Sequence, residues 1–266
     1  MGGRGGVSHR ASGGGLPKTL ARFAELQRTA MARIGAVLSR TDQMYLQGQL
    51  QQLFAQNDFG MRIRSELLER VLGSHFKSQF ETNSSQGSLD QYSRNRAAEN
   101  MFGVDTSTLK ASEHEKYGYL VSRDKAAAME NYMASQYGDA VIRFKREAVI
   151  DRLTYTVGDS LFDATRNQLV AGSVKNTSIT GFAGDITDYL QRVRASESYV
   201  GSAETWASKV AYDYLELQYH GTLTMSDVAS VTFSDVTPRG FAALVEKLKK
   251  KGISVWQVRE GKAHAL

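Results

Sequence analysis

The chain contains no cysteine and only two prolines among its 266 residues. The absence of cysteine excludes a disulfide framework, thiolate metal sites and cysteine nucleophiles. No stretch approaches the roughly 18 uninterrupted apolar residues of a membrane-spanning helix. The opening residues, MGGRGGVSHR, lack an apolar segment, so no secretory signal peptide is expected. An apolar fraction of 41% and a charged fraction of 23% indicate a globular protein with enough apolar material for a core.

Positive charge is concentrated near the N-terminus. Residues 1–40 carry a net charge of +6, whereas the other 226 residues carry a net charge of −1. The folded body is therefore not a basic nucleic-acid-binding globule. Residues 1–17 are rich in glycine, and we expect a flexible leader there because so few apolar groups cannot offset the entropy of ordering. Residues 18–40 predict a basic amphipathic helix, which either packs on the core or binds an acidic partner or a membrane surface.

Helical periodicity continues over residues 43–76, with a turn expected between two apolar stripes near Asn57, Asp58 and Gly60. From about residue 117 the pattern changes to short apolar runs that are typical of strands. We expect strands at 117–121, 140–144, 153–157, 211–220, 228–233 and 253–258, and helices at 91–101, 124–136, 185–195 and 239–251.

The strands at 140–144 and 153–157 follow each other closely in the sequence, so we expect them to pair. The order of elements predicts an α+β fold. In this interpretation a helical region over residues 18–110 packs on an α+β domain over residues 111–266, whose sheet is mostly antiparallel.

The strongest strand signal, AYDYLELQYH at 211–220, places two kinds of side chain on opposite faces. One face is largely apolar, and the other carries Tyr214, Glu216, Gln218 and His220. This polar face either meets water, as the outer face of an antiparallel sheet does, or lines a cleft. In a cleft, Glu216 is a candidate catalytic carboxylate, and Gln218 and Tyr214 are candidates to hold a ligand.

A second candidate segment is LTYTVGDS at 153–160. Thr154 and Thr156 share one face of the expected strand, and Ser160 follows a turn at Gly158 and Asp159. These hydroxyls either bind a polar ligand or belong to an ordinary strand with a capped turn. No metal site is expected, because the histidines at positions 9, 75 and 264 are scattered and have no ligand spacing.

Four segments together resemble a known family: YGYL at 117–120, YGDAVIRFKR at 137–146, LTYTVGDSL at 153–161 and YLELQYHGTLTMSDVASVTF at 214–233. They are similar to the ADP-ribosyltransferase-like domains of phage head-associated proteins and bacterial polymorphic toxins, over about residues 113–258. The resemblance implies a split β-sheet fold with NAD, as substrate, between two strand groups. It also implies a mono-ADP-ribosyltransferase that transfers ADP-ribose from NAD to a protein target, or an NAD glycohydrolase. The implied location is the virion or the host cytoplasm.

The resemblance also assigns roles to residues. Glu216 matches the family's catalytic glutamate, and Thr154 and Thr156, with Ser160 after them, match its Ser/Thr-rich strand. Gln218 is placed to orient the acceptor. Tyr214 stands where members that modify arginine carry Glu or Gln, so arginine is not the implied acceptor. The expected NAD-binding set is Thr154, Thr156, Ser160, Tyr214, Gln218 and Arg143.

The family's early-strand Arg or His has no single counterpart in this sequence. His114, Lys116, Arg143, Arg94 and Arg96 are all candidates for it. The alternative function is a non-catalytic phage structural or interaction protein. In that case the basic arm, residues 1–40, binds nucleic acid or an acidic partner.

Overall fold

The structure is a computed structural model. It describes residues 15–83, 90–129, 135–157, 160, 161, 169–182, 186, 187, 190, 191, 194, 215–235, 237 and 239–266. Four predictions lie wholly or mostly outside these residues: the leader, the turn at Gly158 and Asp159, the helix at 185–195 and the position of Tyr214.

The described strands are β1 (Asn57–Ile63), β2 (His75–Phe76), β3 (Lys116–Ser122), β4 (Ala140–Phe144), β5 (Leu153–Val157), β6 (Gly172–Ser173), β7 (Leu215–Tyr219), β8 (Leu223–Thr224), β9 (Val228–Phe233), β10 (Ser254–Arg259) and β11 (Lys262–Ala265). Nine of them form one sheet in the order β11-β10-β9-β4-β1-β3-β7-β5-β6, and β2 pairs with β8. All neighbours in the large sheet are antiparallel except β9 and β10.

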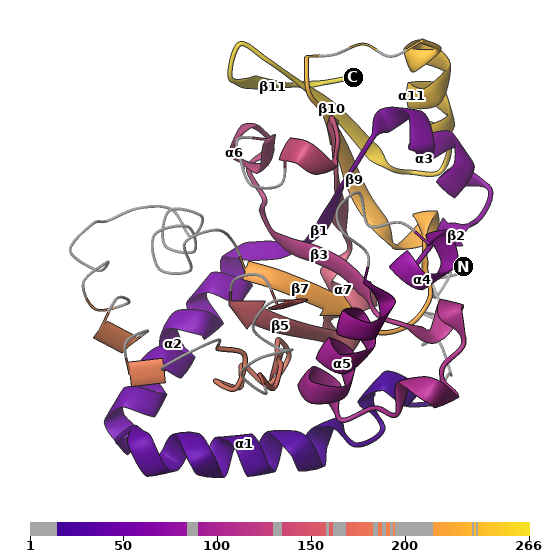
Figure 1. Cartoon of the computed structure of the whole chain (residues 1–266). Coiled ribbons are helices and arrows are strands. Elements are labelled where there is room, and N and C mark those ends of the chain that lie inside the picture. The colour runs from indigo at the N-terminus through magenta and orange to yellow at the C-terminus, as the bar shows by residue number, and fades with distance from the viewer. Residues whose placement is uncertain are drawn as a thin grey trace, which may run out of the picture.

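The described α-helices are α1 (Phe23–Val37), α2 (Arg40–Gln56), α3 (Ser65–Leu72), α4 (Gln79–Thr82), α5 (Gln91–Phe102), α6 (Lys125–Met129), α7 (Arg146–Val149) and α11 (Phe241–Lys250). Short 3-10 turns are η1 (Lys18–Leu20), η2 (Thr106–Thr108), η3 (Ala111–Glu113), η4 (Ser135–Tyr137), η5 (Ile150–Arg152) and η6 (Met225–Asp227). The fold is therefore mixed α and β with a large, mostly antiparallel sheet (Figure 1). None of the helices in the described part of the chain is long and apolar enough to cross a membrane.

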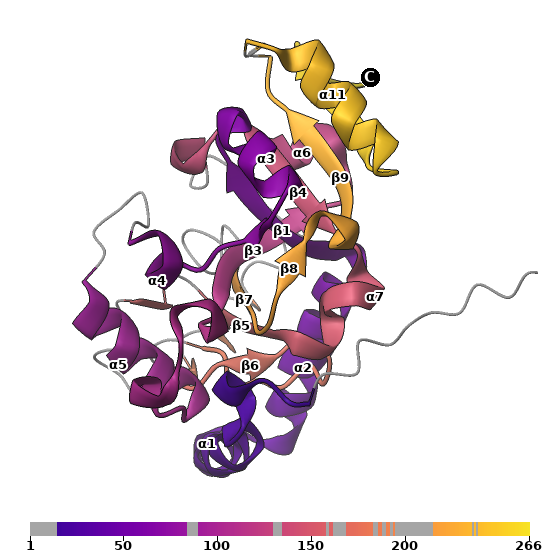
Figure 2. The same cartoon turned by 90° about the vertical axis from the view of Figure 1, so that its right-hand side faces the viewer.

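Strands β7 and β5 are covered on both faces, which explains why all of their residues are buried. Helix α2 buries Leu46, Leu50, Leu53 and Phe54 in the main core, and Phe54 contacts Tyr155 edge to face at 5.0 Å between ring centroids. Helices α2 and α5 lie on opposite sides of these strands (Figure 2).

A second apolar cluster covers the face of β5 and β7 that points away from the main core. It consists of Leu20, Phe23, Ala97, Ala98, Met101, Phe102, Val104, Leu169 and Ala171, and we call it the cover cluster. It combines η1 and the start of α1 with the buried side of α5. Gly103, at φ +68°, ends α5 in the left-handed conformation directly after Phe102. The single helix predicted over 18–40 is interrupted: residues 18–20 form η1, and the α-helix covers Phe23–Val37. It packs on the cover cluster through Phe23, and Met31 and Ile34 pack against the main core.

The predicted strands at 117–121, 140–144, 153–157, 228–233 and 253–258 are confirmed as β3, β4, β5, β9 and β10, to within a residue or so. The run at 211–220 contains β7, and positions 211–214 lie outside the described residues. The helices at 91–101 and 239–251 are confirmed as α5 and α11. Helix α11 connects the two parallel strands, β9 and β10, as parallel pairing requires.

Two predictions about these elements are wrong. Residues 57–63 do not continue the helical pattern with a turn; they form β1, which lies between β3 and β4. Phe59, Met61 and Ile63 alternate with polar residues and glycine, which is the strand period. The expected pairing of 140–144 with 153–157 is also wrong, because α7 and η5 connect β4 to β5 across the sheet. Strand β4 pairs with β1 and β9, and β5 pairs with β6 and β7.

Candidate active site

The register of the sheet brings the two candidate segments together. Strand β7 pairs with β5 so that Glu216 lies opposite Thr156, and Gln218 lies opposite Thr154. Residues directly opposite each other in an antiparallel pair point to the same face. Glu216, Gln218, Thr154 and Thr156 therefore share one face, which we call the polar face, while Leu215, Leu217 and Tyr219 point to the main core.

Glu216 is held in place by two hydrogen bonds to its Oε1 atom. The Ser160 hydroxyl donates one, and Gln218 Nε2 donates the other at 3.0 Å. Gln218 Nε2 also donates to Thr156 Oγ1 at 3.0 Å. Two donors converge on the same oxygen of Glu216, so its carboxyl group has a defined orientation. Four of the predicted site residues, Glu216, Ser160, Gln218 and Thr156, are thus joined directly.

The hydrogen-bonded chain continues away from Glu216. Thr154 Oγ1 donates to Gln218 Oε1 at 2.9 Å and lies 2.9 Å from His220 Nε2. His220 Nδ1 lies 2.9 Å from the hydroxyl of Thr19 in η1. We call this chain, from Thr19 through His220, Thr154 and Gln218 to Glu216, the polar relay. The sequence offers no signal for the last link, because Thr19 and His220 are 201 positions apart.

The polar relay is closed off from water. Glu216 is 5% exposed, and the Gln218, His220, Thr156 and Ser160 side chains are fully buried. The interpretation of this strand face as the solvent face of an antiparallel sheet is therefore wrong. The cover cluster lies over it, with the Phe102 ring edge-on to the His220 ring at 4.6 Å between centroids.

A second group of polar side chains lies beside the relay, and its Tyr117 and Glu115 were missed from the sequence. Tyr117 of β3 lies opposite Gln218, so it shares the polar face. Its hydroxyl donates to Glu115 Oε1 at 2.8 Å, and the Arg94 guanidinium lies 5.0 Å from its ring centroid. Burial first, and Glu115 next, raise the pKa of Tyr117 well above its usual range. The alternation in YGYL already places Tyr117 and Tyr119 on one face, which was a usable signal.

The basic candidates from the sequence occupy different places. Lys116 lies opposite Tyr219, on the other face of the sheet from Glu216, and donates to the carbonyls of Ser112 and His114. The His114 ring stacks on Phe80 at 3.6 Å between centroids. Of these candidates, Arg94 lies against a polar-face residue, and it reaches Tyr117 from a helix rather than from a strand.

Arg143 is separated from the relay by two strands. It lies on β4, and β1 and β3 stand between β4 and β7. Its Nη1 atom donates to Asp58 Oδ2 at 2.6 Å, and its Nε atom donates to Ser230 Oγ at 3.3 Å. Arg123 also pairs with Asp58, at 3.1 Å. The structure thus places Arg143 in an ion-pair cluster around Asp58 and not beside Glu216.

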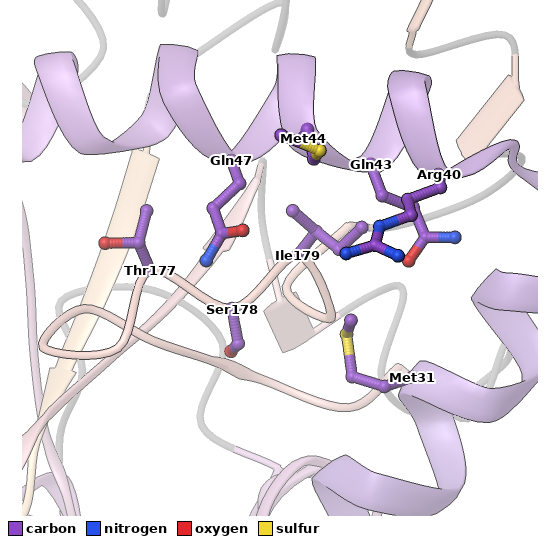
Figure 3. A pocket seen from close by; sticks show the side chains of 8 residues that line it. All are labelled: Met31, Arg40, Gln43, Met44, Gln47, Thr177, Ser178 and Ile179. Atoms are coloured by element: carbon purple, nitrogen blue, oxygen red, sulfur yellow. The ribbon is translucent and has the colours of Figure 1, made fainter.

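A pocket of about 380 Å³ lies between the two N-terminal helices and the segment that follows β6 (Figure 3). Its walls are Met31 of α1, Arg40, Gln43, Met44 and Gln47 of α2, and Thr177, Ser178 and Ile179. Tyr155 donates to the carbonyl of Ser178 at 2.6 Å. Because Tyr155 points away from the polar face, this pocket is separate from Glu216. Over the described part of the chain, no group of three or more His, Asp or Glu residues is placed to hold a metal ion.

The buried imidazole of His220 makes stability depend on pH. Burial lowers the pKa of His220 to about 3, with a smaller contribution from Lys116. The unfolded chain protonates this histidine near its ordinary pKa of about 6.5, whereas the folded protein keeps it neutral. The free energy of unfolding is therefore highest above pH 6.5 and decreases as the pH falls toward 3.

We expect a slope from His220 of roughly 1 kcal/mol per pH unit between pH 6 and pH 4, measured by urea unfolding. A His220→Gln variant should be less stable at pH 7 and show a shallower slope. The exposed His264→Gln variant is the matched control and should keep the wild-type slope. Equal slopes in all three proteins would contradict a neutral His220.

The comparisons with known proteins give no independent assignment. No protein-family model matches the chain, and no curated protein is similar to it in sequence. The functional inference consequently depends on the geometry around Glu216.

Proposed function

We propose that the chain is a mono-ADP-ribosyltransferase, which transfers ADP-ribose from NAD to a protein acceptor, with Glu216 as its catalytic residue. The observation that carries the proposal is the position of Glu216 on β7, opposite the threonine strand β5 and oriented by Ser160 and Gln218. We further propose that the sheet is of ADP-ribosyltransferase type, although its nine described strands are paired continuously and are not split into two groups as the resemblance implies. The adjacent Glu strand and Thr strand support that assignment.

The reaction explains why a fixed carboxylate is useful. The bond between ribose C1′ and the nicotinamide nitrogen breaks, and its electron pair leaves with nicotinamide. Positive charge develops on the ribose, and a carboxylate near the 2′-hydroxyl stabilises it in the transition state. The acceptor nucleophile then bonds to C1′ and loses a proton; with water as acceptor the same site is an NAD glycohydrolase.

The residues around Glu216 contribute by orienting its carboxylate. A preorganised charge stabilises a transition state because it does not have to reorient during the reaction. Ser160 and Gln218 both donate to the same oxygen of Glu216, which fixes the plane of the carboxylate. In this proposal Thr156 and Ser160 also line the ribose subsite, while Thr154 acts within the relay.

NAD can reach Glu216 only if the structure around it opens. The carboxylate is 5% exposed and lies beneath the cover cluster. Binding of NAD therefore requires the cover cluster, or the segments next to it, to move away from β7. The phage or toxin setting, and a location in the virion or the host cytoplasm, belong to the same proposal.

Calorimetric titration of the full chain with NAD is the first test. We expect saturable binding at one site per chain. Incubation with NAD labelled in its adenylate part and with a cell lysate should then produce labelled protein and free nicotinamide. An absence of binding at millimolar NAD would overturn the proposal.

A second function is favoured by the exposed cations of the N-terminal helices. Arg28 and Arg33 of α1, Arg22 just before it and Arg40 at the start of α2 are all exposed, while Phe23 of α1 is buried. In the alternative proposal, the chain is a non-catalytic interaction protein that binds nucleic acid or an acidic partner through these arginines.

We expect this second function to give binding of single-stranded or duplex DNA that weakens steeply with salt, as counterion release requires. The paired substitution Arg28→Gln and Arg33→Gln should reduce the slope of log K against log salt by about two. Fluorescence anisotropy measures it. Substituting Lys249 and Lys250 on α11 is the matched control, and a salt slope that responds equally to both pairs would argue against a site on α1.

A further inference from the structure

The polar relay ends outside the sheet, on a residue of the N-terminal arm. Thr19 is fully buried and lies in η1, whose turn is closed by hydrogen bonds from Leu20 N to the Pro17 carbonyl at 2.8 Å and from Ala21 N to the Lys18 carbonyl at 3.1 Å. Lys18 forms an ion pair with Glu113 at 2.9 Å. The arm is thus fixed at the point where it meets His220.

The carboxylate of Glu216 determines how the Gln218 amide is turned. Gln218 Nε2 faces Glu216 Oε1 at 3.0 Å, so the amide nitrogen is the donor and the carboxyl oxygen is the acceptor. Gln218 Oε1 then faces Thr154, which donates to it at 2.9 Å. The two protons of Nε2 go to Glu216 and Thr156, and the amide has no donor left over.

Proton counting then determines the tautomer of His220. The single hydroxyl proton of Thr154 is used on Gln218, so the bond between Thr154 and His220 has to be donated by His220 Nε2–H. A neutral imidazole has only one N–H group, so Nδ1 is an acceptor. The Thr19 hydroxyl is its donor at 2.9 Å. Every donor in the relay consequently points toward Glu216.

We propose that Thr19 and His220 are positioning residues for Glu216: Thr19 fixes the Nε2–H tautomer of His220, and through Thr154 this tautomer fixes the Gln218 amide that orients the carboxylate. The catalytic part of this inference rests on the proposed function. The N-terminal arm is then a component of the active site and not only a candidate surface for partners.

Removing the Thr19 hydroxyl tests the inference. Thr19→Val keeps the shape of the side chain but leaves Nδ1 without a donor, so neither tautomer satisfies both ring nitrogens. We expect ¹⁵N NMR of the full chain to show the Nε2–H tautomer of His220 in the wild type and a mixture of tautomers in Thr19→Val. Thr19→Ser keeps the hydroxyl and should restore the wild-type spectrum.

Kinetics provide the second readout. We expect Thr19→Val to lower kcat for NAD by about tenfold, the size of one disturbed hydrogen bond to a charged group, with KM within about twofold. Thr19→Ser should have wild-type kcat. Urea unfolding of each variant shows whether the folded state persists under the assay conditions.

The two readouts separate the two proposals. If the wild type does not turn over NAD, the proposed function fails, and the tautomer of His220 still decides whether Thr19 controls the relay. An Nδ1–H tautomer in the wild type, or the same tautomer and the same kcat in the wild type and Thr19→Val, would overturn the positioning role.

Discussion

Replacing Glu216 by glutamine is expected to lower kcat for NAD by roughly 10²–10³-fold, the effect of removing one preorganised transition-state contact. The amide oxygen that the Glu216→Gln substitution introduces can still accept from Ser160 and Gln218, so the fold and the affinity for NAD should be kept. Release of nicotinamide and labelling of acceptor protein measure kcat, and calorimetry measures affinity. A loss confined to kcat identifies an interaction made mainly in the transition state.

The matched control is Glu69→Gln. Glu69 lies on α3 and pairs with Lys247 at 2.8 Å, in an exposed position away from the polar face. Its substitution should leave kcat within about twofold, since exposed ion pairs contribute little. Equal activities of Glu216→Gln and the wild type would remove Glu216 from the mechanism.

Replacing Tyr155 by alanine is expected to lower the free energy of unfolding by about 3–5 kcal/mol, the range for truncating a buried aromatic side chain. The ring is fully buried and packs against Phe54. A Cβ at Gly172 or at Gly181 would overlap the ring, so the absence of a side chain at these two glycines leaves the space that the ring fills. Truncation leaves a cavity next to β5, the strand that carries Thr154 and Thr156. Urea unfolding monitored by circular dichroism measures the loss.

Two further tyrosine variants calibrate that result. Tyr155→Phe removes only the hydroxyl that donates to Ser178, and we expect a cost of about 1 kcal/mol. Tyr92→Ala removes a side chain that is 70% exposed and should change the free energy by less than about 0.5 kcal/mol. If Tyr155→Ala were no more costly than Tyr92→Ala, the packing of α2 against β5 would be refuted.

Some features of the fold were predictable because they depend on local patterns. The alternation in LELQYH placed Glu216, Gln218 and His220 on one face, and the structure confirms that arrangement. The same reasoning located β3, β4, β5, β9 and β10. Side-chain direction alternates along any extended chain, whatever the strand's neighbours are.

Other predictions were wrong because the features concerned depend on residues that are distant in the sequence. Residues 57–63 follow a long helix and contain Asn57, Asp58 and Gly60, which favour turns, so their weak alternation was overlooked. Burial between β3 and β4 decides that they form a strand. Strand β11 was missed as well, because it is short and mostly exposed and has little apolar pattern.

The sequence by itself determined which residues carry the polar chemistry and which of them share a strand face, since both follow from residue type and the two-residue period of a strand. Tertiary structure alone decided that β5 is the neighbour of β7, that two strands separate Arg143 from β7, and that Thr19 completes the hydrogen bonding of His220. These are choices among many sterically allowed pairings, and they are settled by the summed burial of side chains contributed from all parts of the chain.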